Sequence, residues 1–494
     1  MDVAQMLWQS VPPWATATFF TVDLIIRLVA LGVVPHNRRP SAAWGWLLVI
    51  FFFPILGGLI FLVLGRATLP ATRQKKQRQA VDLLSPEDTG TSAALTAELP
   101  VWLQETIRLN EHNGAFALTG SNRLDILTHY DDTLQAMADQ IRNAQSYVHF
   151  QFYIAVADPT TEPVVSALEH AHRRGIRVLV LIDHIGSVGY PGYRQIVQRL
   201  DKAGIPWRRM LPVRPWRGEY QRPDLRNHRK ILVVDGHVAF TGSQNIIDRS
   251  YNKRKNKRKG LQWMGLMLRI EGPAVRHLDA VFVTDWYCET DQIVCEDPAP
   301  ALPPGRQGPE PGIRCQVLPS GPGLAQESNL ELFTHLFASA HERITVCSPY
   351  FVPEDSMYNA LRTAVGRGVE VQLFMGETSS HALTHHAQRS FYELMTRAGV
   401  AICLYKAPYV LHSKFILIDE DVTVVGSSNM DIRSFALDHE VSLLVIDSEF
   451  VHRMRTVVQS YHTDSHQLDL QTWLSRPWYQ KYLDNTARLT SALQ

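Results

Sequence analysis

Residues 228–235 read His228-Arg-Lys230-Ile-Leu-Val-Val-Asp235, and residues 412–419 repeat the pattern as His412-Ser-Lys414-Phe-Ile-Leu-Ile-Asp419. The first copy continues into Gly242-Ser243-Gln-Asn245 and Arg249-Ser250, the second into Gly426-Ser427-Ser-Asn429 and Arg433-Ser434. All eight identities fall at one offset of 184 residues. Since a given residue matches by chance about once in twenty, the chain contains an internal duplication. The matched residues are polar or glycine, which is typical of a functional site rather than of a repeated core.

The duplication extends to the predicted secondary structure. Strands are expected at 147–155 and 177–183 with a helix at 162–174, and again at 343–352 and 369–375 with a helix at 354–367. Each helix ends at a glycine, Gly175 or Gly368, before a β-branched strand. Residues 297–312 hold six prolines and three glycines in 16 residues and are expected to connect the halves. Beyond its N-terminus, the chain is thus predicted to be a duplicated α/β unit.

Each half presents one set of polar side chains together. Histidine and lysine lie two residues apart on a strand, so they point to the same face. Asp235-Gly236 is a hairpin-turn signal before a strand at 238–242. A two-residue loop there would place His228 opposite Ser243, and the same geometry would place His412 opposite Ser427.

Lysine and asparagine (Asn245 or Asn429) would flank each of these pairs. Such a set can bind a phosphate, with lysine as the charge, serine and asparagine as donors, and histidine as nucleophile or acid. Asp235 and Asp419 sit at the turns, where a structural role is favoured over contact with a substrate.

The composition limits the class of protein. The chain has 494 residues with Lys+Arg 49 and Asp+Glu 48, and 45% of its residues are hydrophobic, which excludes disordered, collagen-like and disulfide-rich chains. The balanced charge argues against a dedicated nucleic-acid-binding protein. Five cysteines, odd in number and without a Cys-x-x-Cys pair, are interpreted as reduced thiols: Cys288, Cys295, Cys315, Cys347 and Cys403.

Apolar residues concentrate at the N-terminus. Residues 42–65 contain no charge, and 24 residues in one helix can cross a hydrocarbon core of about 30 Å. Residues 14–34 are also long enough, and they carry Asp23 and Arg27 four positions apart, where the two can pair. No Lys or Arg precedes this stretch, unlike in a cleavable signal. We therefore predict a two-helix transmembrane hairpin.

Basic residues predict the orientation of this hairpin. Five of them follow the second span, whereas only Arg38 and Arg39 lie in the turn, so the remaining roughly 400 residues are expected in the cytoplasm. The five are Arg66, Arg73, Lys75, Lys76 and Arg78. The predicted organisation is a hairpin at 1–66, a linker at 67–118, a first half at 119–296, a connector at 297–312, a second half at 313–470 and a tail at 471–494.

The paired His-x-Lys-x4-Asp segments, each followed by Gly-Ser-x-Asn, resemble the phospholipase D superfamily over about residues 118–470. With the N-terminal hairpin, the turn Arg38-Arg39-Pro40 and the segment Ser348-Pro-Tyr-Phe-Val-Pro353, the whole chain resembles the bacterial cardiolipin synthases. The resemblance implies two pseudo-symmetric phospholipase D-like halves, each a mixed sheet flanked by helices, in a multi-pass protein of the bacterial inner membrane. It also implies transfer of a phosphatidyl group between two phosphatidylglycerols, giving cardiolipin and glycerol.

The resemblance further implies residue roles. His228 would attack the phosphorus to form a phosphatidyl-histidine, and His412 would protonate the glycerol and then deprotonate the second lipid. Lys230, Lys414, Asn245 and Asn429 would stabilise charge on the phosphoryl oxygens. The full implied catalytic set is His228, Lys230, Asp235, His412, Lys414 and Asp419, with Ser243, Asn245, Ser427, Asn429 and Glu440 binding phosphate or orienting.

One departure from the family concerns the histidine-orienting carboxylate. In the second half Glu440 stands at its place, whereas the first half has Met264-Gly265 after Trp263. His228 is therefore expected either to lack its own orienting group or to borrow another residue.

No cofactor is expected, because exchanging one phosphodiester for another needs no nucleotide, and no Gly-x4-Gly-Lys-[Ser/Thr] loop is present. No metal is expected either. His381, His385 and His386 have ligand-like spacing but no neighbouring cysteine or paired carboxylates, so a helix face or a lipid entrance is favoured. The expected partners are phosphatidylglycerol and anionic membrane lipid, without nucleic acid or an obligatory protein partner.

Two segments and three alternative functions stay open. Residues 253–259, with six basic residues in seven, form either a solvated loop or a dock for anionic lipid. The tail, with Trp478, Tyr479 and Tyr482, either lies along the membrane interface or packs on the domain. A phospholipase D hydrolase would use the same residues with water, and phosphatidylethanolamine or another alcohol could be the second substrate. A nuclease of the superfamily would not need the anchor, and a membrane scaffold would not need two intact motifs.

Overall fold

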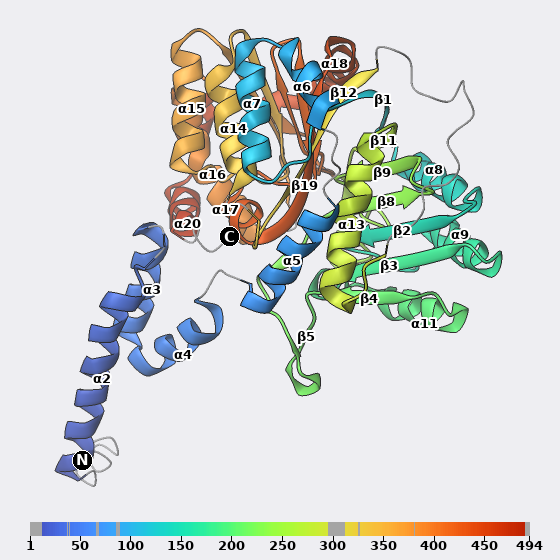
Figure 1. Cartoon of the computed structure of the whole chain (residues 1–494). Coiled ribbons are helices and arrows are strands. Elements are labelled where there is room, and N and C mark those ends of the chain that lie inside the picture. Colours follow the sequence, from blue (N-terminus) through green and yellow to red (C-terminus); the bar gives the residue numbers. More distant parts are fainter. Residues whose placement is uncertain are drawn as a thin grey trace. The chain divides into compact units, whose positions relative to one another are not determined.

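The computed structural model describes residues 12–36, 38, 40–65, 69–84, 89–294, 312–324, 327–379 and 381–489. They divide into two compact units, one up to residue 68 and one from Leu69 onward (Figure 1). The predicted connector at 297–312 lies outside the described residues except for Gly312, and so does Cys295.

The first unit consists of α2 (Pro13–Val33), α3 (Pro40–Phe52) and α4 (Pro54–Leu64). Helix α2 is long and apolar enough over Trp14–Val33 to cross a membrane. The predicted pairing within it is confirmed, since Arg27 Nη2 lies 2.9 Å from Asp23 Oδ2.

The prediction of one continuous helix over 42–65 is wrong, because the chain breaks between α3 and α4. Pro54 has no N–H and disfavours helical backbone at the preceding residue, and Phe53 accordingly adopts φ −135° and ψ 71°. A Cβ on Gly57 would lie 2.8 Å from the Val49 carbonyl oxygen, so only glycine permits this close contact of α4 with α3. Two short apolar helices therefore replace the second span.

The second unit is built on one sheet whose strand order is mirrored about its middle. The order is β4-β3-β2-β8-β9-β11-β1 in the first half and β12-β19-β18-β17-β13-β14-β15-β20 in the second, joined where β1 and β12 pair antiparallel. The strands of the first half are β1 (Thr119–Leu127), β2 (Tyr147–Phe152), β3 (Arg177–Asp183), β4 (Trp207–Met210), β8 (Lys230–Val234), β9 (Val238–Gly242) and β11 (Met267–Glu271). Those of the second are β12 (Ile313–Ser320), β13 (Arg343–Cys347), β14 (Glu370–Gly376), β15 (Ala401–Tyr405), β17 (Phe415–Ile418), β18 (Val422–Gly426), β19 (Asp438–Ile446) and β20 (Ser465–Gln467).

Helices cover the sheet in the same mirrored way. The outer helices are α8 (Tyr130–Arg142), α9 (Glu162–Arg173) and α11 (Tyr193–Ala203) in the first half, and α14 (Ser328–Ser339), α15 (Asp355–Gly366) and α16 (Ala382–Arg397) in the second (Figure 1). Each half ends in a further helix, α13 (Ala274–Thr290) or α18 (Ser448–Thr463). Leu278 of α13 and Phe450 of α18 belong to one buried cluster with strands of both halves, so the two halves share a core.

The predicted elements of the two halves are confirmed, with small shifts at their ends. Strand β3 has the predicted bounds, and α9 ends one residue early at Arg173. The strand expected at 147–155 ends at Phe152, and Ile154 then bonds through its N–H to the Asn245 side chain at 3.2 Å.

The segment predicted as a linker at 67–118 instead carries three helices, α5 (Ala71–Leu84), α6 (Thr89–Ala97) and α7 (Val101–His112). Leu103 and Ile107 of α7 are buried, and Arg73 of α5 forms an ion pair with Glu289 of α13 at 2.5 Å. These helices are therefore part of the second unit.

The two-residue hairpin loops predicted at Asp235-Gly236 and Asp419-Glu420 are wrong by one position. Val234 pairs with Val238, and Ile418 pairs with Val422, so each loop has three residues. The Asp235 N–H donates to the Tyr147 carbonyl at 3.0 Å, and the Asp419 N–H donates to that of Arg343 at 2.8 Å. Because each aspartate bonds to the neighbouring strand rather than across its hairpin, the register moves, and His228 and Ser243 are not directly opposed.

The two aspartates make matching contacts. Asp235 accepts the backbone N–H groups of Gln145, Ser146 and Tyr147 at 2.9, 2.7 and 2.9 Å. Asp419 accepts those of His341, Glu342 and Arg343 at 2.9, 2.8 and 2.8 Å. Each carboxylate thus fixes the start of the strand that lies beside its own hairpin. Each aspartate sits at the turn of that hairpin, whereas the histidine lies at the other end.

We expect Asp235→Ala and Asp419→Ala each to destabilise the chain by about 2–4 kcal/mol, because each leaves three strand-starting N–H groups without their charged acceptor. Thermal unfolding of the detergent-solubilised protein measures the effect. Asp421→Ala, two positions along and exposed, is the matched control and should leave the midpoint unchanged. Wild-type stability of the Asp235 and Asp419 variants would show that the aspartates do not hold the fold.

Candidate active site

The two histidine loops are each held by the opposite half. Strand β7 (Arg226–Asn227) pairs parallel with the start of β19, and the His228 N–H donates to the His439 carbonyl at 2.8 Å. Strand β16 (Tyr409–Leu411) pairs parallel with β10 (Gln262–Met264), and the His412 N–H donates to the Met264 carbonyl at 2.7 Å. These reciprocal pairings bring the two repeats of the sequence into one site between the halves.

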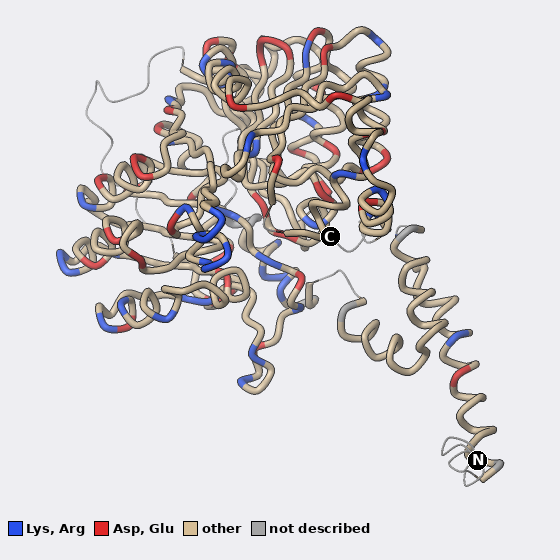
Figure 2. Tube along the Cα trace, turned by 180° about the vertical axis from the view of Figure 1, so that it is seen from behind, with Lys and Arg blue, Asp and Glu red and all other residues tan. Residues whose placement is uncertain are grey.

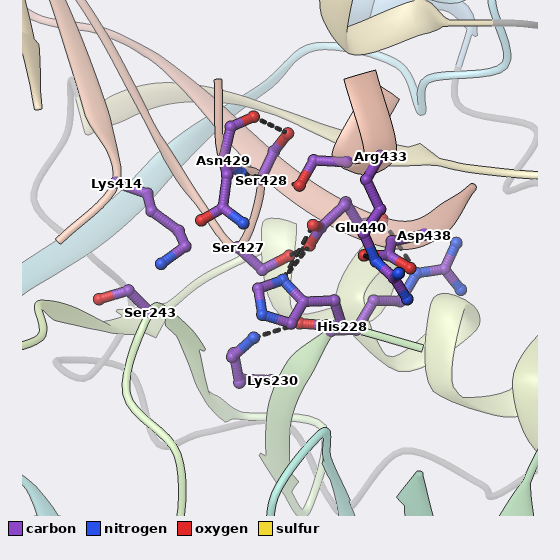
Figure 3. Close-up of polar contacts among 12 residues, drawn as sticks. His228, Lys230, Ser243, Lys414, Ser427, Ser428, Asn429, Arg433, Asp438 and Glu440 are labelled. Atoms are coloured by element: carbon purple, nitrogen blue, oxygen red, sulfur yellow. Dashed lines mark hydrogen bonds and ion pairs between the residues drawn. The ribbon is translucent and has the colours of Figure 1, made fainter. Parts of the chain in front are cut away.

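His228 is oriented by a carboxylate of the second half. Its Nδ1 lies 2.9 and 3.0 Å from the two oxygens of Glu440 (Figure 3). Glu440 is fully buried, and the Ser427 hydroxyl also donates to it. Burial acts to raise the pKa of Glu440, but the nearby His228 and Lys230 outweigh it and the pKa is lowered. A buried carboxylate is therefore held ionised against one edge of the imidazole, and Nε2 is the ring nitrogen left for a substrate.

The expectation that His228 borrows an orienting residue is thus met by Glu440, and within the described part of the chain no carboxylate is hydrogen-bonded to His412. Met267 pairs with Gly242 in the first half, and Ser442 pairs with the equivalent Gly426 in the second. Gly265 lies two residues before Met267 and Glu440 lies two residues before Ser442, so Gly265 is the structural counterpart of Glu440. A Cβ on Gly265 would lie 3.1 Å from the Ser243 hydroxyl. His412 Nδ1 instead lies 3.1 Å from the Ser243 carbonyl oxygen. The two imidazoles consequently have different electrostatic partners.

The two lysines are buried beside the histidines. Lys230 donates through Nζ to the His228 carbonyl, and Lys414 donates to the His412 carbonyl at 2.9 Å. Burial lowers the pKa of Lys230 to about 7 and that of Lys414 well below its usual value. Burial also lowers the pKa of His228 to about 4 and that of His412. Four basic groups and one carboxylate leave the site short of negative charge, which an anionic phosphodiester would supply.

The predicted serines and asparagines lie at the same site, but most are already bonded to protein. The Ser243 hydroxyl accepts the Leu266 N–H at 2.8 Å, and that of Ser427 accepts the Val441 N–H at 3.0 Å. The Asn245 amide donates to the Tyr251 hydroxyl at 2.9 Å. Asn429 Oδ1 is buried without a hydrogen-bond partner in the described residues. Among the four, Asn429 is the one with an unpaired side-chain oxygen in the described residues, and this oxygen can only accept a hydrogen bond.

Several neighbours of the site escaped the sequence reasoning. Tyr153 packs edge-on against His228 with ring centroids 4.8 Å apart, and Tyr251 approaches His412 at 6.4 Å. Asp438 is buried, forms an ion pair with Arg433 at 3.1 Å, and has its pKa raised to about 7 by burial. Arg433 is one of the repeated identities, which could have drawn attention to it. The tyrosines carry no repeat signal.

Two of the three histidines considered as metal ligands contact residues outside this set. His386 Nδ1 lies 2.7 Å from Asp484 of α20 (Trp478–Arg488), and the His381 ring packs edge-on against Tyr350 at 5.8 Å. Asp484 is buried and also pairs with Arg389 and Arg476. The tail therefore packs on the domain, while Trp478, Tyr479 and Tyr482 stay exposed.

The basic run forms the short helix α12 (Arg254–Arg258), whose lysines and arginines are exposed. Lys253 Nζ lies 4.6 Å from the centre of the Tyr190 ring.

The family described as "Cardiolipin synthase, PLD-like domain" matches residues 137–286 and 333–461, and "Phospholipase_D-nuclease N-terminal" matches residues 18–66. The chain belongs to the cardiolipin synthase family of phospholipase D-like proteins. The two matched ranges fall within the two halves of the sheet, so the duplication seen in the sequence is a pair of phospholipase D-like domains.

Full-length relatives agree with this family. The chain is 31% identical to "Cardiolipin synthase A" of Pectobacterium carotovorum subsp. carotovorum over 95% of its own length and 98% of that protein. The identity and coverage are the same for "Cardiolipin synthase A" of Edwardsiella ictaluri. The crystal structure of phosphatidylserine synthase from Haemophilus influenzae covers 79% of this chain and 100% of its own, with 14% identity and a TM-score of 0.55, which shows a shared fold.

We expect Glu440→Gln to lower the rate of phosphatidyl transfer by about 100-fold, because the neutral amide no longer fixes the His228 tautomer or balances a charged imidazole. Ser427→Ala, which removes a donor to Glu440 and an acceptor for the Val441 N–H but keeps the carboxylate, should cost about 10-fold. Turnover numbers at saturating substrate measure both effects. The exposed Glu449→Gln is the control, and a Glu440→Gln enzyme with wild-type turnover would show that the cross-half contact is not used.

Proposed function

We propose that this chain is a cardiolipin synthase that transfers the phosphatidyl group of one phosphatidylglycerol to the terminal hydroxyl of a second. The observation that carries the proposal is the pair of buried His–Lys sets, one from each half, around a site with more basic groups than carboxylates. A phosphodiester fits such a site as an anion between two lysines, and two imidazoles can divide nucleophilic and proton-transfer work. The near full-length likeness to proteins named cardiolipin synthase A supports the choice of lipid.

In the first step we assign the attack on phosphorus to Nε2 of neutral His228. A P–N bond forms, the P–O bond to the glycerol headgroup breaks, and the departing oxygen takes a proton from His412, whose protonated form the negative charge of the bound phosphodiester favours. Glu440 keeps the other nitrogen of His228 protonated and balances the positive ring that results. We assign to Lys230, Lys414 and the amide N–H of Asn429 the stabilisation of charge on the phosphoryl oxygens.

In the second step the terminal hydroxyl of another phosphatidylglycerol enters. It loses its proton to His412 while its oxygen attacks phosphorus, and the bond to His228 breaks. One phosphodiester replaces another, so the exchange is close to isoenergetic. The same site with water as acceptor would give phosphatidic acid, so exclusion of water separates synthesis from hydrolysis.

The test is a product analysis with the full-length chain in detergent and phosphatidylglycerol as the only lipid. We expect cardiolipin and free glycerol in equal amounts, and a loss of more than about 1,000-fold with His228→Ala, which removes the nucleophile. Acid-quenched samples should contain phosphatidyl-histidine in the wild type and none in the His228 variant. Phosphatidic acid as the main product would replace the proposal with a hydrolase, and a product formed only after adding phosphatidylethanolamine would change the second substrate.

We also propose that α3 and α4 together return the chain across the membrane after α2, so that the anchor passes it more than once and the catalytic unit lies in the cytoplasm. The support is the excess of basic residues after α4 over those between α2 and α3. Protease added to intact spheroplasts should spare the catalytic unit, whereas protease added to inverted membrane vesicles should digest it. The opposite pattern would reverse the orientation.

A further inference from the structure

A small hairpin beside the active site exposes apolar and basic side chains together. It consists of β5 (Val213–Arg214), the turn Pro215–Arg217 and β6 (Glu219–Tyr220), and it projects away from the sheet (Figure 1). Trp216 at its tip is 77% exposed, the next residue Arg217 is exposed, and Arg214 forms an ion pair with Glu219. Tryptophan flanked by arginine is typical of segments that sit at a membrane–water interface.

Helix α10 (His184–Val188) also exposes apolar side chains, since Ile185 and Val188 are 39% and 48% exposed. The Val213 N–H donates to His184 Nδ1 at 3.1 Å, which ties the hairpin to this helix. We call Ile185, Val188, Trp216 and Arg217 the rim.

The rim adjoins the active site on the His228 side. Helix α10 holds Tyr153 in place, since the Ser187 hydroxyl donates to the Tyr153 carbonyl at 2.9 Å. The Tyr153 ring in turn packs on the His228 ring. A ligand that reaches His228 past Tyr153 therefore passes close to the exposed side chains of α10.

The base of the hairpin is tied to the start of the second unit. Leu211 and Leu225, which flank the hairpin, form a buried cluster with Leu69. Glu289 accepts the Leu211 N–H at 3.0 Å and pairs with Arg73 of α5, whose Lys75 and Arg78 are exposed. Figure 2 shows basic residues along both the hairpin and α5.

We propose that the rim is the membrane-docking surface of the catalytic unit and that its occupant is the interfacial layer of an anionic phospholipid bilayer. The inference rests on the proposed function, because a lipid whose acyl chains stay in the bilayer must present its phosphate at the height of His228. Trp216, Ile185 and Val188 enter the boundary of the acyl chains. Arg217, with Lys75 and Arg78 of α5, faces the lipid phosphates.

The test compares the full-length wild type with Trp216→Ala/Arg217→Glu. In proteoliposomes of phosphatidylglycerol and phosphatidylcholine, we expect this double variant to make cardiolipin at least 10-fold more slowly. With a short-chain phosphatidylglycerol below its micellar concentration, the two proteins should agree within 2-fold, because no surface has to be entered. Both changed side chains are exposed, so folding should be kept, and equal thermal midpoints check this.

Two controls separate the rim from other surfaces. Arg397→Glu reverses an exposed charge on α16 and should have no effect in either assay. Trp478→Ala changes the equally exposed tryptophan of α20. A loss in proteoliposomes with Trp478→Ala but none with the double variant would overturn the proposal, as would an equal loss on the soluble short-chain lipid.

A second readout does not depend on catalysis. Hydrogen exchange at residues 213–220 should be at least 10-fold slower in phosphatidylglycerol nanodiscs than in phosphatidylcholine nanodiscs, and the double variant should abolish this difference. Protection in a protein that makes no product would keep the docking surface and reject the proposed reaction. Product formation without protection would reject the docking surface alone.

Discussion

The hydrogen bond between His228 and Glu440 is the contact on which the site depends. It joins an imidazole of the first half to a carboxylate of the second, and the carboxylate is fully buried. An unpaired buried carboxylate would cost several kcal/mol, so the pair holds only while the two halves keep their mutual position. The parallel pairing of β7 with β19 and the His228–His439 backbone bond supply that position. Separating the two halves would therefore disrupt the site and at the same time leave the Glu440 carboxylate without its histidine partner.

The duplication makes the site possible, and its imperfection makes the two histidines different. A fully symmetric pair would give both imidazoles a carboxylate and the same chemical character. Gly265 at the place of Glu440 leaves His412 with a backbone carbonyl instead. Nucleophile and proton carrier have different requirements in a two-step transfer, and an asymmetric pair can meet both. The same repeat thus supplies the buried lysine twice and the orienting carboxylate once.

Burial sets the electrostatics of the site in favour of an anion. Both lysines are buried next to the histidines, and the pKa of each lysine is lowered because water cannot solvate its charge. The negative charge of a bound phosphodiester would favour the protonated, charged form of both lysines. The free site is therefore expected to bind an anion such as a lipid phosphate in preference to a cation. The hairpin that carries Trp216 lies next to this site through α10 and Tyr153. A lipid can then reach the site by its headgroup while its acyl chains remain in the bilayer.

Local residue patterns determined much of this protein. The apolar N-terminus, the two α/β halves, the bounds of β3 and the start of α9 follow from composition and periodicity, because each reflects contacts between near neighbours. The paired histidines and lysines follow from the repeat of the sequence at one offset of 184 residues. The break at Phe53 was also readable in Pro54, whose effect on the preceding residue is local, although the charge-free run suggested a single span.

Only the tertiary structure decided which side chains and strands contact one another. The one-residue change of the hairpin registers follows from the bonds of Asp235 and Asp419 to strands about 75 to 90 residues away. The assignment of Glu440 to His228 depends on a contact over 212 positions between two halves. Sequence spacing specifies which side chains share a strand face, but the packing of separate strands decides which of them meet, and that depends on long-range contacts that no local pattern encodes.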